Sequence, residues 1–110
     1  MWADNNDKIM EIMNNLDGTA GVFPAHCPVC GEKEGHLCIH RYDALHGGIW
    51  IWCSSCNSYM HMSGIIPDWW NNMPDIEEAK LEASPQYLDE RKNAIDAWVN
   101  NLLESKEVSR

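Results

Sequence analysis

Apolar residues recur at steps of three and four near the start of the chain, at Ile9, Ile12, Met13 and Leu16. This spacing places them on one face of a helix. Asp4 is a suitable N-cap, and Gly18 is a suitable stop after the last apolar position. The pattern therefore predicts a helix from Asp4 to Leu16, followed by a connector over residues 19–25.

The middle of the chain contains three short runs in which apolar and polar residues alternate. These runs cover residues 36–42, 49–53 and 58–62, and Gly47-Gly48 provides a turn between the first two. Alternation with a period of two is typical of a β-strand. We expect a three-stranded antiparallel sheet that presents Trp50 and Trp52 on one face and isoleucines on the other.

The last part of the chain returns to helical spacing. Pro67-Asp68-Trp69-Trp70 predicts a short turn or helix, and Pro74 restarts the chain into residues 76–81. Ser84 then caps a longer helix with Pro85 at its first position. The residues on the apolar face of this helix are Leu88, Ile95, Val99 and Leu102.

These elements define an α+β fold: a three-stranded antiparallel sheet packed with an N-terminal helix and two to three C-terminal helices. The chain has 110 residues, which suits one modest hydrophobic core. We predict a single domain over residues 1–110, in which the sheet region 26–63 lies between an N-terminal part, 1–25, and a helical part, 64–110.

Four cysteines form two C-x-x-C pairs, with Cys27 and Cys30 in the first and Cys53 and Cys56 in the second. Two thiolates at this spacing can turn inward on one tight loop and bind one ion at about 2.3 Å. Gly31 and Asn57 follow the two pairs, and both residue types tolerate the positive φ that such a loop requires. The pattern predicts one structural Zn²⁺ held by four cysteines.

Other interpretations of the cysteines lead to different chemistry. Iron also suits a tetrahedral set of four thiolates, and His26 could replace one ligand. Two disulfides would require an oxidising compartment, whereas the polar and acidic first residues do not resemble a signal peptide. We therefore expect reduced thiols and a cytoplasmic location. Cys38, in the first strand, is interpreted as a small buried apolar residue, and His36 and His40 are expected to face solvent or outer-shell partners.

The cysteine loops resemble those of three families over residues 27–63 only. Cys27-Pro28-Val29-Cys30-Gly31 and Cys53-Ser54-Ser55-Cys56 are similar to the loops of the zinc-ribbon superfamily. Residues 48–56 resemble primase-type zinc modules, which implies DNA binding. The first loop also resembles rubredoxin, which implies iron and electron transfer.

Charge narrows the choice of partner. The formal net charge is −9, and Lys33 and Arg41 are the only bases between residues 27 and 67. A protein that binds phosphates needs a concentrated basic face, so this distribution disfavours nucleic acid. No apolar run approaches the roughly 20 residues of a membrane span. Residues 68–110 carry ten acids and five bases, so the acidic region lies after the predicted sheet.

The six tryptophans are interpreted first as core, with helices packed over Trp50 and Trp52. Trp69 and Trp70 are adjacent and cannot both face inward, so this pair is the candidate for partial exposure. The sequence contains no constellation that indicates an enzyme. The candidate partner-binding residues are Trp69, Trp70, Asp75, Glu77, Glu78 and Glu82.

Together these features favour a small acidic binding protein that inhibits a basic partner. The hypothesis is a stoichiometric inhibitor, such as an immunity protein or antitoxin, of a basic bacterial toxin such as a nuclease. The alternatives are a nucleic-acid-binding zinc ribbon of primase or transcription-factor type and a rubredoxin-like electron carrier. The sequence leaves the oligomeric state open.

Overall fold

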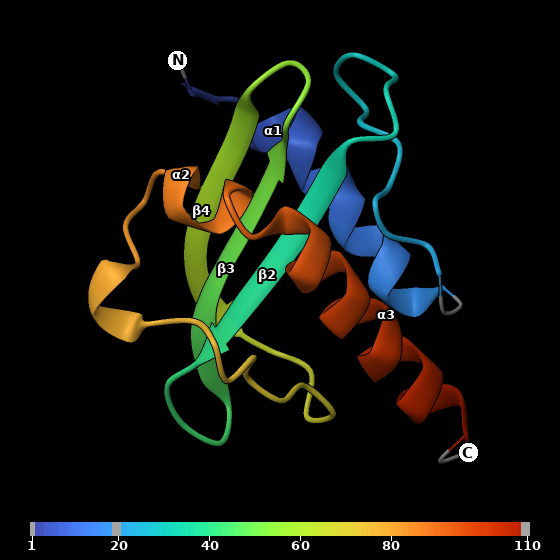
Figure 1. The fold of residues 1–110 in the computed structure, drawn as a ribbon, viewed down its shortest axis with the longest axis vertical. Coiled ribbons are helices and arrows are strands. Elements are labelled where there is room, and N and C mark those ends of the chain that lie inside the picture. Colours follow the sequence, from blue (N-terminus) through green and yellow to red (C-terminus); the bar gives the residue numbers. More distant parts are fainter. Residues whose placement is uncertain (1, 19–20, 109–110) are drawn as a thin grey trace.

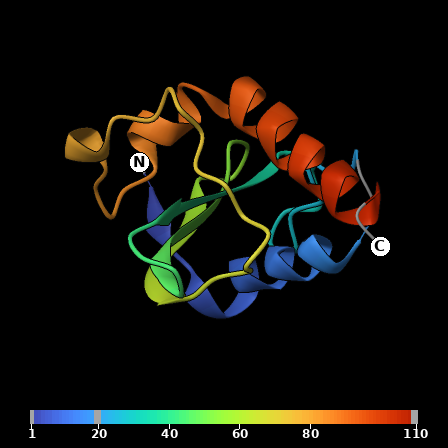
Figure 2. The same ribbon diagram turned by 90° about the horizontal axis from the view of Figure 1, so that it is seen from below.

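A computed structural model describes residues 2–18 and 21–108, so Thr19 and Ala20 of the expected connector lie outside the described residues. Its elements in chain order are β1 (Ala3–Asp4), α1 (Asn6–Ile9), the 3-10 helix η1 (Met10–Asp17), β2 (Gly35–Arg41), β3 (His46–Cys53), β4 (Ser58–Ile65), the 3-10 helix η2 (Glu78–Lys80), α2 (Gln86–Asp89) and α3 (Lys92–Val108). They form three layers: α1 and η1 cover one face of the sheet, and α2 and α3 cover the other (Figures 1 and 2).

The α+β class is confirmed, but the sheet has four strands, in the order β1-β4-β3-β2. Strands β2, β3 and β4 are antiparallel, as expected, and β1 adds a short parallel pairing with β4. The Ala3 N–H donates to the Asn57 carbonyl at 2.8 Å, and the Asn5 N–H donates to the Tyr59 carbonyl at 3.0 Å. A strand of only two residues is too short to show alternation, so the sequence pattern did not predict β1.

The predicted N-terminal helix is shorter and more irregular than expected. Asp4 belongs to β1 instead of capping a helix, and the helical region consists of one turn of α1 followed by η1. The apolar stripe was nevertheless identified correctly, because Ile9, Ile12 and Leu16 are buried against the sheet. Burial of these side chains, rather than regular α-helical hydrogen bonding, fixes this segment.

The two faces of β3 are both buried, and the helices pack over the tryptophan face as predicted. The Trp50 indole N–H donates to the Glu82 carbonyl at 2.6 Å, and the Trp52 indole N–H donates to Asp89 Oδ1 at 3.1 Å. On the opposite face, a Cβ at Gly35 would lie 2.6 Å from Cδ1 of Ile12, so η1 packs directly on the sheet there.

The C-terminal helix predicted from Ser84 is divided into α2 and α3. The Arg91 N–H donates to the Leu88 carbonyl at 2.9 Å, which tightens the chain between the two helices. Leu88, Ile95 and Val99 are buried, in agreement with the predicted apolar face. Residues 76–81 form only the single turn η2, so most of the segment before α2 follows the surface without regular structure.

Candidate metal centre

The four cysteines of the two C-x-x-C pairs meet at one end of the sheet. Cys27 and Cys30 lie in the loop before β2, Cys53 ends β3, and Cys56 lies just before β4. Their Sγ atoms all lie within 4.8 Å of one another. Within residues 2–18 and 21–108, this is the cluster of side chains that could hold a metal ion.

The two cysteine loops fold alike. The Gly31 N–H donates to the Cys27 carbonyl at 2.8 Å, and the Asn57 N–H donates to the Cys53 carbonyl at 3.0 Å. Gly31 has a φ of 83° and Asn57 a φ of 62°, as the sequence predicted for the residue after each pair.

Backbone N–H groups inside the loops also point at sulfur. The Val29 N–H donates to Cys27 Sγ at 3.3 Å, and the Ser55 N–H donates to Cys53 Sγ at 3.4 Å. Such bonds favour the thiolate form that a metal requires.

The distances between sulfurs fit a tetrahedral ion. Cys27 Sγ lies 3.7 Å from Cys56 Sγ, and Cys30 Sγ lies 3.7 Å from Cys53 Sγ. Four ligands at about 2.3 Å around one ion are separated by about 3.8 Å along each edge of the tetrahedron. A disulfide would bring two sulfurs to about 2.05 Å. The arrangement therefore suits metal ligation, with each close pair linking one loop to the other.

The protonation of the thiols is uneven. Burial raises the pKa of both Cys27 and Cys53. Desolvation also raises the pKa of Cys56, but hydrogen bonds with the Ser58 side chain and backbone, and with the neighbouring cysteines, outweigh it and lower that pKa to about 7. A bound cation would release the protons that burial retains on the other thiols.

Within the described part of the chain, no histidine belongs to the cluster. His26 is exposed, with Nδ1 at 3.4 Å from the Gly31 carbonyl. His40 is half-buried and lies 3.7 Å from Glu78.

The expectation for His36 was wrong. His36 is buried, and its Nδ1 lies 2.8 and 3.0 Å from the two carboxylate oxygens of Asp96 on α3. The partner lies 60 residues away in sequence, so no local pattern could identify it.

Asp89 and Ser54 join the second cysteine loop to the helices. The Ser54 hydroxyl donates to Asp89 Oδ1 at 2.5 Å, and this oxygen also accepts the Trp52 indole N–H. The Ser54 N–H donates to the Glu34 carbonyl at 3.0 Å, which links the loop to the segment before β2. Asp89 was not predicted from the sequence, where its only signal is a carboxylate next to the apolar Leu88.

The candidate partner-binding residues differ in exposure. Asp75, Glu77, Glu78 and Glu82 are exposed, and Trp69 is half-buried with the Lys106 Nζ 5.2 Å from its ring centroid. Trp70 is only 1% exposed, so its indole lies in the core rather than on a binding surface. One tryptophan of the pair faces inward, consistent with the geometric argument from sequence.

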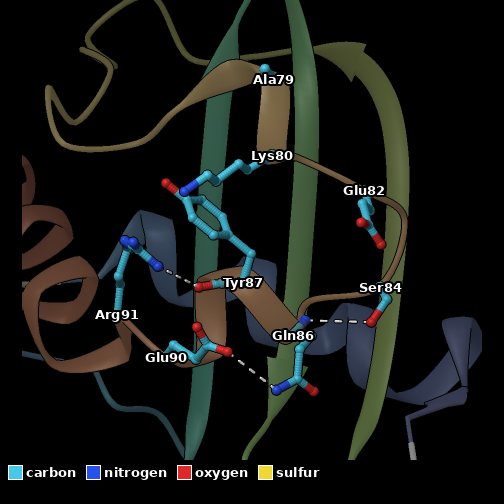
Figure 3. A pocket seen from close by; sticks show the side chains of 8 residues that line it. All are labelled: Ala79, Lys80, Glu82, Ser84, Gln86, Tyr87, Glu90 and Arg91. Carbon is cyan, nitrogen blue, oxygen red and sulfur yellow. Dashed lines mark hydrogen bonds between the residues drawn. The ribbon is translucent and has the colours of Figure 1, made fainter.

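A cavity of about 460 Å³ lies between η2 and α2 (Figure 3). The Arg91 guanidinium stacks over the Tyr87 ring at 4.0 Å, and Lys80 pairs with Glu77 at 3.4 Å. The Glu82 and Ser84 side chains lie on the opposite side of this cavity from Arg91. Glu82 and Arg91 therefore line opposite sides of the cavity.

No protein-family model, curated protein or solved structure matches this chain. None of the helices in the described residues has the length and apolar character to cross a bilayer.

Proposed function

We propose that this protein is a non-enzymatic binding protein with a structural zinc site, and that it inhibits a basic protein such as a nuclease toxin. The observation that carries the proposal is the exposure of all four carboxylates at Asp75, Glu77, Glu78 and Glu82. We call this set the acidic segment. The indole of Trp50, which lies in the core, donates to the Glu82 carbonyl and anchors the C-terminal end of this segment.

The chemistry of the cysteine site supports a structural ion. Four thiolates complete a tetrahedron and leave no position for a substrate, which is the ligand set of structural zinc. Elemental analysis of purified protein should find about one zinc per chain, and the protein should be colourless. A red, iron-containing protein would favour electron transfer instead.

Arg41, Trp50 and Trp52 could serve nucleic-acid binding only if their side chains were free, and they are engaged within the fold. The Arg41 guanidinium makes five hydrogen bonds to backbone carbonyls. Trp50 and Trp52 are buried, so their rings are not platforms on which bases can stack. A basic protein is the better complement to a chain of net charge −9.

The test starts with a partner captured from the host and identified by mass spectrometry. We expect a basic protein whose association slows as salt increases. Reversing both Glu77→Lys and Glu78→Lys should slow association about tenfold or more, because steering depends on the charge of this segment. Glu11→Lys combined with Glu104→Lys reverses two exposed acids outside the acidic segment, so it changes the net charge equally, is the matched control and should change the rate much less. Association that is insensitive to salt and to the double reversal would overturn the proposal.

A further inference from the structure

The two long edges of the sheet differ in how their backbone is protected. On β2, Gly35 exchanges two 2.8 Å hydrogen bonds with Ala25. At the other end of β2, the Asn72 side chain accepts from the Arg41 N–H at 2.7 Å and donates to the Arg41 carbonyl at 3.1 Å. Leu37 and Ile39, between these positions, are buried. The β2 edge is therefore closed.

The edge of β4 is closed only where β1 lies beside it. Strand β1 pairs with Ser58 and Tyr59, and its last bond runs from the Asn5 N–H to the Tyr59 carbonyl. Beyond that point β1 ends, and the chain turns away into α1 (Figure 1).

The direction of the remaining β4 backbone follows from the register. The Tyr59 carbonyl points towards β1, whereas the Ile66 N–H points towards the hairpin and donates to the Leu45 carbonyl at 3.0 Å. The β3–β4 register is unbroken between these positions, so His61, Ser63 and Ile65 direct their N–H and C=O groups away from β3. Among the described residues, no hydrogen bond satisfies these backbone groups.

This open edge, His61 to Ile65, also lacks the usual protection against strand addition. Native edges are blunted by charges, prolines or bulges, and this segment has none of them. Desolvation lowers the pKa of His61, which favours its neutral form. Ile65 is 72% exposed, and Leu45, whose carbonyl accepts from Ile66, is 47% exposed. An apolar surface thus continues from the end of the edge.

We infer that the open edge of β4 receives an extended segment of the basic partner as an added strand. The inference rests on the proposed function for the charge of that partner. Its backbone would pair with the N–H and C=O groups of His61, Ser63 and Ile65, which is recognition by β-strand addition.

Carboxylates near the edge select a basic segment over a second copy of this chain. Among the described residues, the Glu82 carboxylate has no hydrogen-bond or ion-pair partner. The Glu82 carbonyl accepts from the Trp50 indole N–H. The Trp50 ring in turn stacks on His61 of the open edge, with ring centroids 4.4 Å apart. The Glu82 side chain is drawn between β3 and β4 in Figure 3. Asp4 and Asp7 are exposed where β1 gives way to α1. Lysines or arginines of an added strand would meet these acids, whereas a second copy would bring like charges together.

The test uses two synthetic strands, one alternating lysine with valine and the other alternating glutamate with valine. Each is about six residues long, the usual length of a strand. The Lys–Val peptide should shift the amide NMR signals of His61, Ser63 and Ile65 and slow their hydrogen exchange. We expect the Glu–Val peptide to bind at least about tenfold more weakly, because it places like charges beside the acids.

Ser63→Pro removes one outward N–H, whereas Ser63→Ala keeps it and serves as the matched control. The proline variant should bind the Lys–Val peptide about tenfold more weakly, and the alanine variant should bind as the parent does. If the proline variant does not fold, Ile65→Lys replaces it and should weaken Lys–Val binding while strengthening Glu–Val binding. Equal binding by the parent and the folded variant, or shifts confined to other residues, would overturn the inference.

Sedimentation of the free protein tests the other occupant. We expect a monomer, whereas a dimer abolished by Ser63→Pro would assign the edge to a second copy and overturn the inference. The captured partner separates this result from the proposed function. If Ser63→Pro leaves partner affinity unchanged while the Glu77 and Glu78 reversals weaken it, the strand addition fails and the proposed function stands. If charge reversal has no effect, the proposed function fails regardless of peptide binding.

Discussion

At one end of the sheet four thiol groups meet across two loops, and at the other end a single guanidinium group ties the β2–β3 hairpin to the segment after β4. The Arg41 side chain donates to the carbonyls of Asp43, Ala44, Pro67 and Trp70, with the shortest bond at 2.7 Å. Both ends gather loops that carry little regular structure, and neither end is held by apolar packing alone.

The two ends differ in where the positive charge comes from. Arginine brings a permanent cation whose N–H groups match several carbonyls at once. The cysteines form a negative ligand set that needs an external ion once their protons leave. The hairpin end should therefore hold its structure independently of metal, whereas the cysteine end should not.

Cys30→Ser should have the largest effect, because it removes one of the four ligands and with it most of the metal affinity. We expect loss of bound zinc and a much lower melting temperature, since metal binding energy at such sites is also folding energy. Elemental analysis and thermal melting monitored by circular dichroism measure both. Cys38→Ala is the control: Cys38 is buried outside the cluster, its burial raises the pKa of its thiol to about 12, and the variant should retain one zinc per chain.

Arg41→Lys tests the other end. Lysine keeps the charge but cannot reproduce a planar fork that reaches four carbonyls, so we expect a loss of about 2–3 kcal/mol, the scale of hydrogen bonds to a charged group. Urea unfolding measures the loss, and zinc content should stay unchanged. Arg91→Lys is the matched control, because Arg91 makes one backbone hydrogen bond, to the Tyr87 carbonyl at 3.2 Å. If both variants were equally stable, the hairpin end would not depend on Arg41.

These two ends also show what sequence can predict. The cysteine loops were predictable in detail, because spacing and the residues Gly31 and Asn57 determine a local structure. Arg41 gave no such signal, since its acceptors are backbone carbonyls, which every sequence contains. The His36–Asp96 pair was missed for a related reason: it joins β2 to α3, and its distance in sequence leaves no period to detect.

The short strand β1 was missed because two residues are too few for a pattern. The boundaries of the helices were less predictable than their buried faces. Ile9, Ile12 and Leu16 are all buried, although the backbone from Met10 onward is a 3-10 helix. Residues three apart, such as Ile9 and Ile12, share a side in both types of helix.

Ser54→Ala should have a smaller effect at the cysteine end. It removes the 2.5 Å hydrogen bond to Asp89 but leaves all four ligands, so we expect a loss of about 1 kcal/mol in unfolding free energy with zinc retained. Ser55→Ala lies in the same loop with an exposed side chain and should be nearly neutral. If Ser54→Ala lost zinc, the cysteine loop would need the hydrogen bond to Asp89 in order to bind the metal. That result would contradict the expected small effect.

The smallest effects should be opposite pH dependences at two carboxylates. At Asp43, in the hairpin, hydrogen bonds from the Leu45 and His46 N–H groups lower the pKa, so its contribution to stability is present above its unfolded value of about 4 and is lost as pH falls. At Asp96, desolvation raises the pKa despite the opposing His36 contact. Its contribution is therefore present below about pH 4 and is lost as pH rises through the folded value.

Asp43→Asn and Asp96→Asn separate these two contributions. Relative to the parent at the same pH, Asp43→Asn should become less destabilising as pH falls from 7 to 3, and Asp96→Asn should become more destabilising. Urea midpoints at each pH provide the measurement, and taking differences against the parent cancels the protonation of the cysteines, which all three chains share. Differences that run in the same direction would contradict the assigned environments, because only the buried carboxyl beside His36 has its neutral form favoured by burial.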